Sequence, residues 1–118
     1  MSETTVTIYH NPRCSKSRAT LALLQDRGIE PRIVRYLETP PSADDVLDLA
    51  RKLGRPVVAL LRRKEPEYRA LGLSDETDDA TAAAAVAAHP RLLERPIVVA
   101  GERAAIGRPP EAVLEILP

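Results

Sequence analysis

The chain has 118 residues, with 17 basic and 17 acidic side chains and a formal net charge of zero. This balance, with three tyrosines as the only aromatic residues, gives no electrostatic or stacking basis for binding nucleic acid or an anionic membrane. A single cysteine excludes an intramolecular disulfide framework, and no secretory signal is recognisable, so we expect one cytoplasmic domain over residues 1–118.

The first predicted elements are a strand, a helix and a second strand. Residues 4–10 are β-branched and half apolar, which predicts a short strand. A helix is predicted from Ser15 to a stop at Gly28, and residues 31–37 predict the second strand. The apolar side of the helix is predicted to consist of Ala19, Leu21, Ala22, Leu23 and Leu24.

Helices are predicted to dominate residues 42–89. Ser42 and Asp45 have the spacing of a capping box, and an amphipathic pattern follows them up to Gly54. The segments that come next are predicted to be a helix over 57–63, an irregular or short helical stretch over 64–73, and an alanine-rich helix over 74–88 that stops before His89 and Pro90.

The last elements predicted are a β-hairpin and a closing helix. Strands are expected over 95–100 and 104–107, joined by a tight turn, and a helix over 108–117. The order is therefore β-α-β, several helices, then β-β-α. This order predicts an α/β fold of thioredoxin-like pattern, with a mixed four-stranded sheet and a helical insert near residues 42–89.

Cys14 lies in the turn between the first predicted strand and helix, flanked by Arg13 and Ser15. A lone cysteine is commonly a small buried apolar residue. The start of a helix, however, carries partial positive charge and unpaired N–H groups, and both lower the pKa of a thiol. We therefore predict a reactive thiolate. His10 and Arg18 are further candidate sources of positive potential, and the sequence leaves open which of them reaches the sulfur.

The same helix start is expected to bind an oxyanion. Phosphate is one candidate, but a cysteine-based phosphatase loop needs a longer cradle that ends in arginine. Arsenate is a tetrahedral oxyanion of similar geometry, and thiols can reduce As(V) at neutral pH. This two-electron reduction consumes two thiol equivalents, and because the chain supplies one, the other must come from outside.

Five stretches carry a resemblance to a known family: "YHNPRCSKSR", "YLETPPS", "ALLRRKEPEY", "ERPIVV" and "IGRPPEAVLEIL". They span nearly the whole chain in the same order as in the glutaredoxin-dependent arsenate reductase family, a branch of the thioredoxin-like superfamily. The chain is thus identified as resembling that family.

The resemblance implies a role for each of several residues. Cys14 is implied to attack arsenate, His10 to help to activate the thiol, and Ser17 to belong to the same loop. The three arginines implied to contact the oxyanion and the intermediates are Arg62, Arg95 and Arg108.

Two further positions follow from the same resemblance. Arg63 is an adjacent competitor for the role of Arg62. The family's cis-proline, which faces the cysteine, falls on Pro96.

The resemblance also implies the partners of the reaction. Arsenate or a related oxyanion is the expected substrate, glutathione is the co-substrate that releases the arsenic, and glutaredoxin regenerates the enzyme. No tightly bound cofactor and no metal site are expected.

Two other functions compete with arsenate reduction. One is a monothiol glutaredoxin-like oxidoreductase that acts on glutathione mixed disulfides through Cys14-x-x-Ser17. The other is a non-enzymatic adaptor like the Spx regulators, which share this fold and bind RNA polymerase. Many of those regulators use a Cys-x-x-Cys switch, and Ser17 occupies the position of the second cysteine, which counts against a disulfide switch here.

Overall fold

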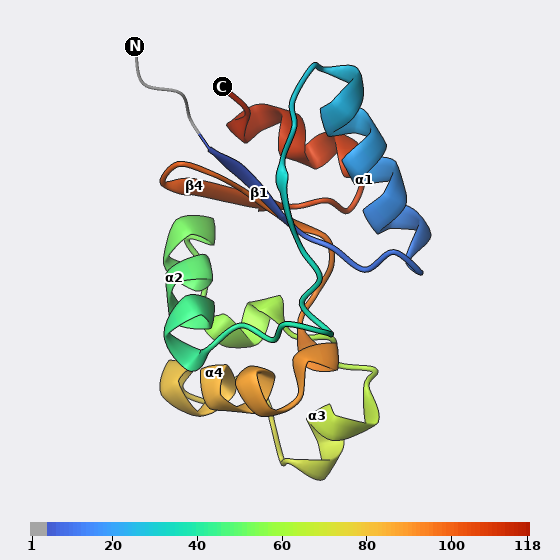
Figure 1. The fold of residues 1–118 in the computed structure, drawn as a ribbon. Helices are drawn as coiled ribbons and strands as arrows, with labels where there is room; N and C mark the ends of the chain where they lie inside the picture. Colours follow the sequence, from blue (N-terminus) through green and yellow to red (C-terminus); the bar gives the residue numbers. More distant parts are fainter. Residues whose placement is uncertain (1–4) are drawn as a thin grey trace. The chain divides into compact units, whose positions relative to one another are not determined.

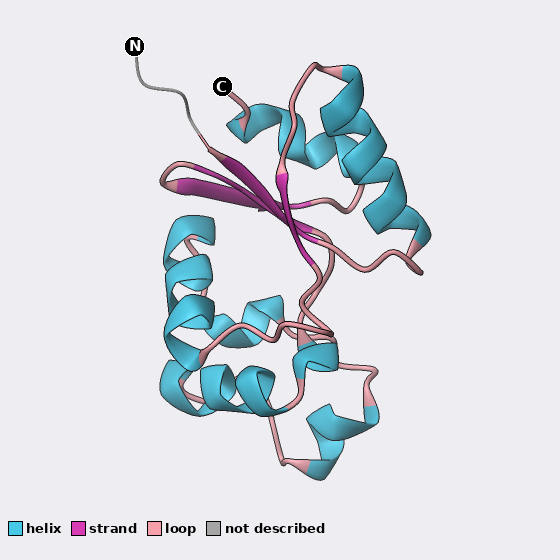
Figure 2. Ribbon diagram, viewed as in Figure 1, coloured by secondary structure: helices cyan, strands magenta, loops and turns pink. Residues whose placement is uncertain are grey.

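The computed structural model describes residues 5–118, which divide into two compact units. We call them the sheet unit, Met1–Tyr36 with Arg95–Pro118, and the helical unit, Leu37–Glu94. The named strands all belong to the sheet unit, and the helical unit consists of helices and loops (Figure 2). The single-domain organisation expected from the sequence stays a prediction.

A mixed four-stranded sheet forms the sheet unit, which confirms the predicted fold class. Its strands are β1 Val6–Tyr9, β2 Arg32–Val34, β3 Ile97–Ala100 and β4 Arg103–Ile106. Their order is β2-β1-β3-β4, with β1 parallel to β2 and antiparallel to β3, and β3 antiparallel to β4. Tyr9, the last residue of β1, lies opposite both Val34 and Ile97, so the loop that follows β1 starts between these two neighbours.

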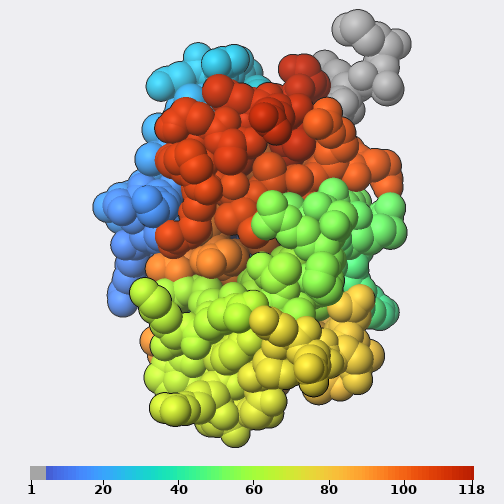
Figure 3. Space-filling view, turned by 180° about the vertical axis from the view of Figure 1, so that it is seen from behind, coloured from blue at the N-terminus to red at the C-terminus, as the bar shows by residue number. Residues whose placement is uncertain are grey.

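The core of the sheet unit comes from side chains that alternate along the strands and recur along the helices. Helix α1, Ser15–Asp26, and the 3-10 helix η3, Pro110–Ile116, lie side by side against the sheet (Figure 1). The space-filling view from behind shows the carboxy-terminal segment exposed next to residues of the first helix (Figure 3). The buried core contains Val6, Ile8, Leu24, Val98, Ala100, Val113 and Ile116.

The buried side of α1 agrees with the prediction only in part. Leu24 is buried, and Leu21 and Leu23 are partly buried against the core, as predicted. The residues buried along this helix are Ser17, Thr20 and Leu24, which follow each other at helical spacing, whereas Ala19 and Ala22 are exposed. Hydropathy predicted that the alanines would be buried. The side chains buried near the start of α1 are instead those of Ser17 and Thr20, and the hydroxyl oxygen of each has a hydrogen-bond partner.

The closing helix is also different, because it is a 3-10 helix over Pro110–Ile116 rather than an α-helix over 108–117. Pro109 and Pro110 have no N–H group, and the first bond at this end runs from Ala112 N–H to the Pro109 carbonyl at 3.0 Å. The tight i to i+3 spacing of that bond is typical of 3-10 geometry.

The helical unit contains the predicted succession of helices, with shorter limits. Its elements are α2 Ala43–Leu53, η1 Val57–Leu60, α3 Pro66–Ala70, α4 Asp79–Ala88 and η2 Pro90–Leu92. The capping box of Ser42 with Asp45 and the left-handed Gly54 at the end of α2 confirm the sequence-based limits of this helix. Helix α4 begins after its cap, Asp78, and ends at Ala88 as predicted.

The helix predicted over 57–63 is reduced to one 3-10 turn. Leu61 forms an isolated antiparallel bridge with Leu93, and the Arg62 N–H donates to the Leu92 carbonyl at 2.7 Å. Leu61 is held in extended conformation, with φ −99° and ψ 145°, which ends the helix at Leu60.

Candidate active site

Cys14 caps the amino-terminal end of α1. Its backbone is extended, with φ −93° and ψ 124°, and its carbonyl accepts the first helical bond from the Arg18 N–H at 3.0 Å. Asn11 closes the loop before it, because its carbonyl accepts from the Cys14 N–H at 3.0 Å and its Oδ1 accepts from the Arg13 N–H at 3.0 Å. The loop therefore presents a partly exposed thiol at a helix start, as the sequence predicts.

The pKa of the Cys14 thiol lies below its ordinary value. Burial raises this pKa, but the backbone N–H of Ser17, the charge of Arg95, the N–H of Lys16 and the charge of Arg108 together outweigh burial. The side chain makes no full capping hydrogen bond in this structure, so these N–H groups act mainly as dipoles that favour the thiolate. The guanidinium groups that stabilise the thiolate thus come from the far end of the sequence.

His10 and Ser17 form a buried pair beside this loop. His10 Nδ1 and Ser17 Oγ lie 2.7 Å apart, and both residues are buried. Ser17 Oγ also accepts the backbone N–H of Asn11 at 3.0 Å. An assignment that satisfies every partner has the Ser17 hydroxyl donating to His10 Nδ1, which leaves the imidazole proton on Nε2.

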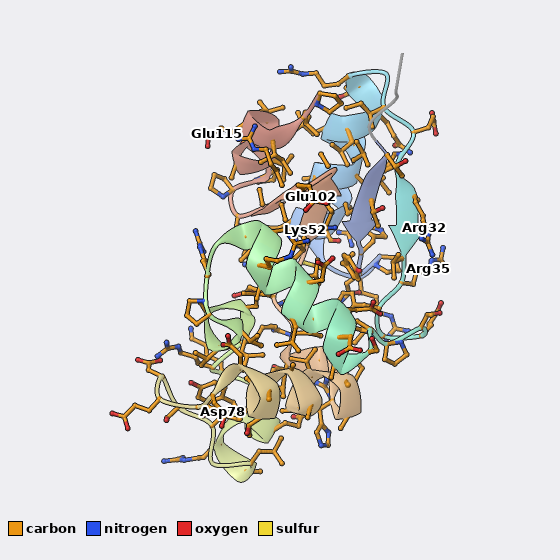
Figure 4. All side chains as sticks on the ribbon, turned by 90° about the vertical axis from the view of Figure 1, so that its left-hand side faces the viewer. Arg32, Arg35, Lys52, Asp78, Glu102 and Glu115 are labelled. Atoms are coloured by element: carbon orange, nitrogen blue, oxygen red, sulfur yellow. The ribbon has the colours of Figure 1, made fainter. Side chains whose placement is uncertain are left out.

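His10 was a candidate source of positive charge near Cys14, but the structure favours its uncharged form. Burial lowers the pKa of His10 from 6.5, and the charges of Arg35 and Arg18 lower it further. The imidazole is therefore predominantly neutral at pH 7. Arg35 follows β2 and projects from the edge of the sheet, close to Arg32 (Figure 4).

Arg95 and Arg108 lie at the open end of the β3–β4 hairpin. Two hydrogen bonds join the chain segments that carry them: Gly107 N–H donates to the Pro96 carbonyl at 2.9 Å, and Arg108 Nε donates to the Arg95 carbonyl at 2.9 Å. The hairpin therefore brings together two of the three arginines that the resemblance implies, and both charges act on the Cys14 sulfur. The cis bond expected before Pro96 is present.

Arg62 and Arg63 belong to the helical unit and differ in their surroundings. Arg62 Nη1 lies 3.6 Å from Glu65 Oε1, and its side chain is 26% exposed. Arg63, at 58% exposure, forms an ion pair with Asp75. The assignment of Arg62 to the oxyanion stays a prediction.

Two residues of the loop environment were missed in the sequence. Asn11 was assigned no role from the sequence, although the Asn-Pro pair is a turn signal that could have pointed to its hydrogen-bonding role. Arg35 could have been found because parallel strands end at the same edge of a sheet, which places the residue after β2 beside the residue after β1.

Residues 5–118 contain neither a cluster of metal-ligating side chains nor a helix that could span a membrane. Within this range, no three His, Cys, Asp or Glu side chains are grouped so that they could hold a metal ion. No helix described in this range is long and apolar enough to cross a membrane.

Comparison with known proteins places the chain among close relatives. The model of a family described as the ArsC family matches residues 9–116. The uncharacterised protein YfgD of Escherichia coli strain K12 is 52% identical over 114 residues, which cover 95% of this chain and 96% of that protein. An arsenate reductase of Neisseria meningitidis serogroup A is 46% identical, with 95% and 97% coverage. The solved structure of an arsenate reductase from Vibrio cholerae superposes with a TM-score of 0.92 at 51% identity, covering 98% of this chain and all of that one.

Proposed function

Because the chain belongs to the ArsC family, we propose that it is an arsenate reductase coupled to glutathione and glutaredoxin, with Cys14 as the nucleophile. Relatives that are named arsenate reductase match it over nearly its whole length. The residues of the sheet unit supply a thiol, an anion-attracting helix start and two guanidinium groups, and these are the parts that such a reaction needs.

One observation carries the proposal: Arg95 and Arg108, which are distant from Cys14 in sequence, both stabilise its thiolate. Guanidinium groups also bind tetrahedral oxyanions through a planar fork of N–H donors. A pair of arginines near a thiolate therefore serves two purposes, since it keeps the sulfur ionised and attracts the anion that the sulfur attacks.

The proposed chemistry balances in two thiol equivalents. The Cys14 thiolate forms a bond to As(V) and displaces one oxygen as hydroxide. The glutathione thiol then attacks the Cys14 sulfur, and the electron pair of the breaking S–As bond stays on arsenic, which leaves as arsenite. Cys14 and glutathione remain joined as a mixed disulfide. Glutaredoxin and a second glutathione reduce this disulfide and restore the Cys14 thiol.

The His10–Ser17 pair is proposed to orient the loop rather than to carry charge. A neutral imidazole with its proton on Nε2 can donate one hydrogen bond and accept the Ser17 hydroxyl. The charge that activates Cys14 then comes from the arginines and the helix start, while His10 and Ser17 hold Asn11 and the loop backbone in place.

The test is arsenate-dependent NADPH oxidation with glutathione, glutaredoxin and glutathione reductase present. Turnover is expected with the full mixture, and omission of glutathione or the Cys14→Ser substitution is expected to abolish it. Thioredoxin alone is expected to be a poor electron donor, since the chain has no second cysteine with which to form the disulfide that thioredoxin would reduce. An absence of arsenate-dependent turnover in the complete mixture contradicts the proposal.

A second candidate is a monothiol oxidoreductase that acts on glutathione mixed disulfides. It is favoured by Ser17, which stands three residues after Cys14 and whose hydroxyl is engaged with His10 and Asn11. Reduction of a glutathionylated peptide by the protein and glutathione, without any turnover of arsenate, would support this alternative over the first.

A further inference from the structure

Gly107 occupies a position in which no side chain fits. A Cβ atom there would lie 2.6 Å from Thr20 Oγ1, 3.2 Å from Thr20 Cγ2 and 2.8 Å from Pro96 Cγ. The backbone of Gly107 is not left-handed, in contrast to Gly28, where the added atom would meet nothing within 4 Å. Space, rather than backbone conformation, therefore requires glycine at position 107.

The contact at Gly107 joins the three segments that carry the thiol and the two arginines. Thr20 lies on the buried side of α1, six residues after Cys14, and its hydroxyl donates to the Lys16 carbonyl at 2.8 Å. Gly107 immediately precedes Arg108, and its N–H donates to the carbonyl of Pro96. The segment after β4 thus passes directly alongside α1 (Figure 1).

Neither side of this contact can move independently. Thr20 is fully buried and is fixed to its own helix by its hydroxyl. On the other side, the backbone bond from Gly107 and the side-chain bond from Arg108 both end on the residue pair 95–96. A change in the distance between Thr20 and Gly107 therefore displaces the hairpin end, with its guanidinium groups, relative to the start of α1.

We propose that Thr20 and Gly107 are positioning residues for the reaction at Cys14, because their close contact sets the spacing between the thiol and the two arginines of the hairpin. This inference rests on the proposed function only where it predicts a change in arsenate turnover. The predicted change in the pKa of Cys14 does not depend on the substrate.

The first measurement is the rate of Cys14 alkylation by iodoacetamide as a function of pH. Gly107→Ala is expected to raise the apparent pKa of Cys14 by about half a unit or more, since the attraction between charges falls with distance. In the arsenate assay, the same variant is expected to lose about tenfold or more in kcat/KM, because small displacements of reacting groups are costly.

A compensating substitution tests whether the contact itself is responsible. Thr20→Ala removes both Thr20 atoms that obstruct a methyl group at position 107. The double variant Gly107→Ala with Thr20→Ala is therefore expected to have a Cys14 pKa closer to that of the wild type than Gly107→Ala alone, with partial recovery because Pro96 Cγ remains. If the pKa change in the double variant equals the sum of the changes in the two single variants, the proposal is overturned.

Gly28→Ala is the matched control for loss of stability. It forces a left-handed backbone position onto alanine at the other end of α1, where nothing surrounds the new atom. It is expected to lower the melting temperature and to leave the Cys14 pKa unchanged. A Gly107→Ala protein that melts earlier but keeps the wild-type pKa of Cys14 would show that Gly107 is merely structural, and the proposal would fail.

The test survives if Gly107→Ala does not fold. The comparison is then between Thr20→Ala and the double variant, in which the added methyl group has room. The double variant is expected to fold and to have a Cys14 pKa closer to that of the wild type than Thr20→Ala, because the methyl group refills the space. A double variant that stays unfolded, or that has the higher pKa of the two, overturns the proposal. A protein without arsenate turnover but with these pKa changes would refute the proposed function and leave the positioning role standing.

Discussion

The imidazole Nδ1 of His10 and the hydroxyl Oγ of Ser17 lie 2.7 Å apart, with both residues buried beside the loop that ends at Cys14. Ser17 Oγ also accepts the Asn11 N–H, so one hydroxyl joins the first helix to two successive residues of the loop. The pair is a hydrogen-bonded connection between the element that carries the thiol and the strand that precedes it.

Ser17→Ala is expected to destabilise the fold by about 1–3 kcal/mol, because it leaves the buried His10 nitrogen and the Asn11 N–H without their partner. Chemical denaturation at pH 7 measures the change. Ser15→Ala, at an exposed position of the same helix, is the control. Equal stabilities of the two variants would contradict the role of the hydroxyl.

His10 is expected to make the protein more stable as the pH rises through the region below 6.5. Its pKa in the folded state is lowered, so between that value and about 6.5 the unfolded chain binds the proton and the folded chain does not. The free energy of unfolding therefore falls with decreasing pH in this window, by at most about 1.4 kcal/mol per pH unit.

His10→Asn keeps an acceptor near the position of Nδ1 and removes the titration. Denaturation curves of both proteins at several pH values between 5 and 7 give the comparison. The difference in stability between wild type and variant is expected to change with pH, with the wild type gaining toward neutrality. A difference that is constant across this range would refute the assignment.

The thiol of Cys14 is expected to titrate below about 8.5, the reference for a free cysteine. The reason is the combined effect of the helix start and the two hairpin arginines, which exceeds the opposing effect of burial. Iodoacetamide alkylation followed against pH provides the midpoint. A midpoint at or above the reference value is the result that excludes an activated nucleophile.

Arg108→Ala is expected to raise the pKa of Cys14 and to lower kcat/KM for arsenate roughly ten- to hundred-fold, the loss typical of one charge-assisted contact. Stability should change little, since Arg108 is exposed. Arg108→Lys should also impair turnover, because an ammonium group lacks the planar fork. Arg27→Ala, which also removes one positive charge but at the carboxy-terminal end of α1, is the control. It should change neither the pKa of Cys14 nor kcat/KM for arsenate.

Arg62 and Arg63 offer a test of a role assigned by resemblance alone. If Arg62 binds the oxyanion, Arg62→Ala should raise KM or lower kcat for arsenate, whereas Arg63→Ala should affect neither, because Arg63 is largely exposed and paired with Asp75. Steady-state kinetics of the two variants decide between these adjacent residues. The opposite pattern would transfer the role to Arg63.

The sequence predicted the sheet unit well where local patterns and packing agree. The β-branched, half-apolar composition of residues 4–10 located β1, in which Val6, Thr7, Ile8 and Tyr9 alternate as buried and half-buried. The closing helix was located correctly, but its type was not. Pro109 and Pro110 stand at the helix start, where an α-helix also tolerates proline, so they do not distinguish an α-helix from a 3-10 helix.

The candidate site was harder to predict from local sequence patterns. Cys14 could be located by its position at a helix start, but no spacing rule connects it to Arg95 or Arg108, and these two were inferred only through the family resemblance. Hydropathy did not predict the burial of Ser17 and Thr20, because their hydroxyl groups form hydrogen bonds that exist only in the folded chain. Gly107 gave no turn signal of its own, since its requirement comes from the neighbouring helix.

The pairing of β1 with β3 determines when the sheet of this protein can form. Ile8 and Val98 are partners at the centre of the sheet, yet the whole helical unit is synthesised between them. At about 5–20 residues per second, a ribosome needs roughly 5–20 seconds to advance from the first of these residues to the second. During that interval β1 and the thiol-bearing loop have been made without their central partner strand. Closure of so long a loop is also the kind of contact that slows refolding, so the helical unit can reach its structure before the sheet does.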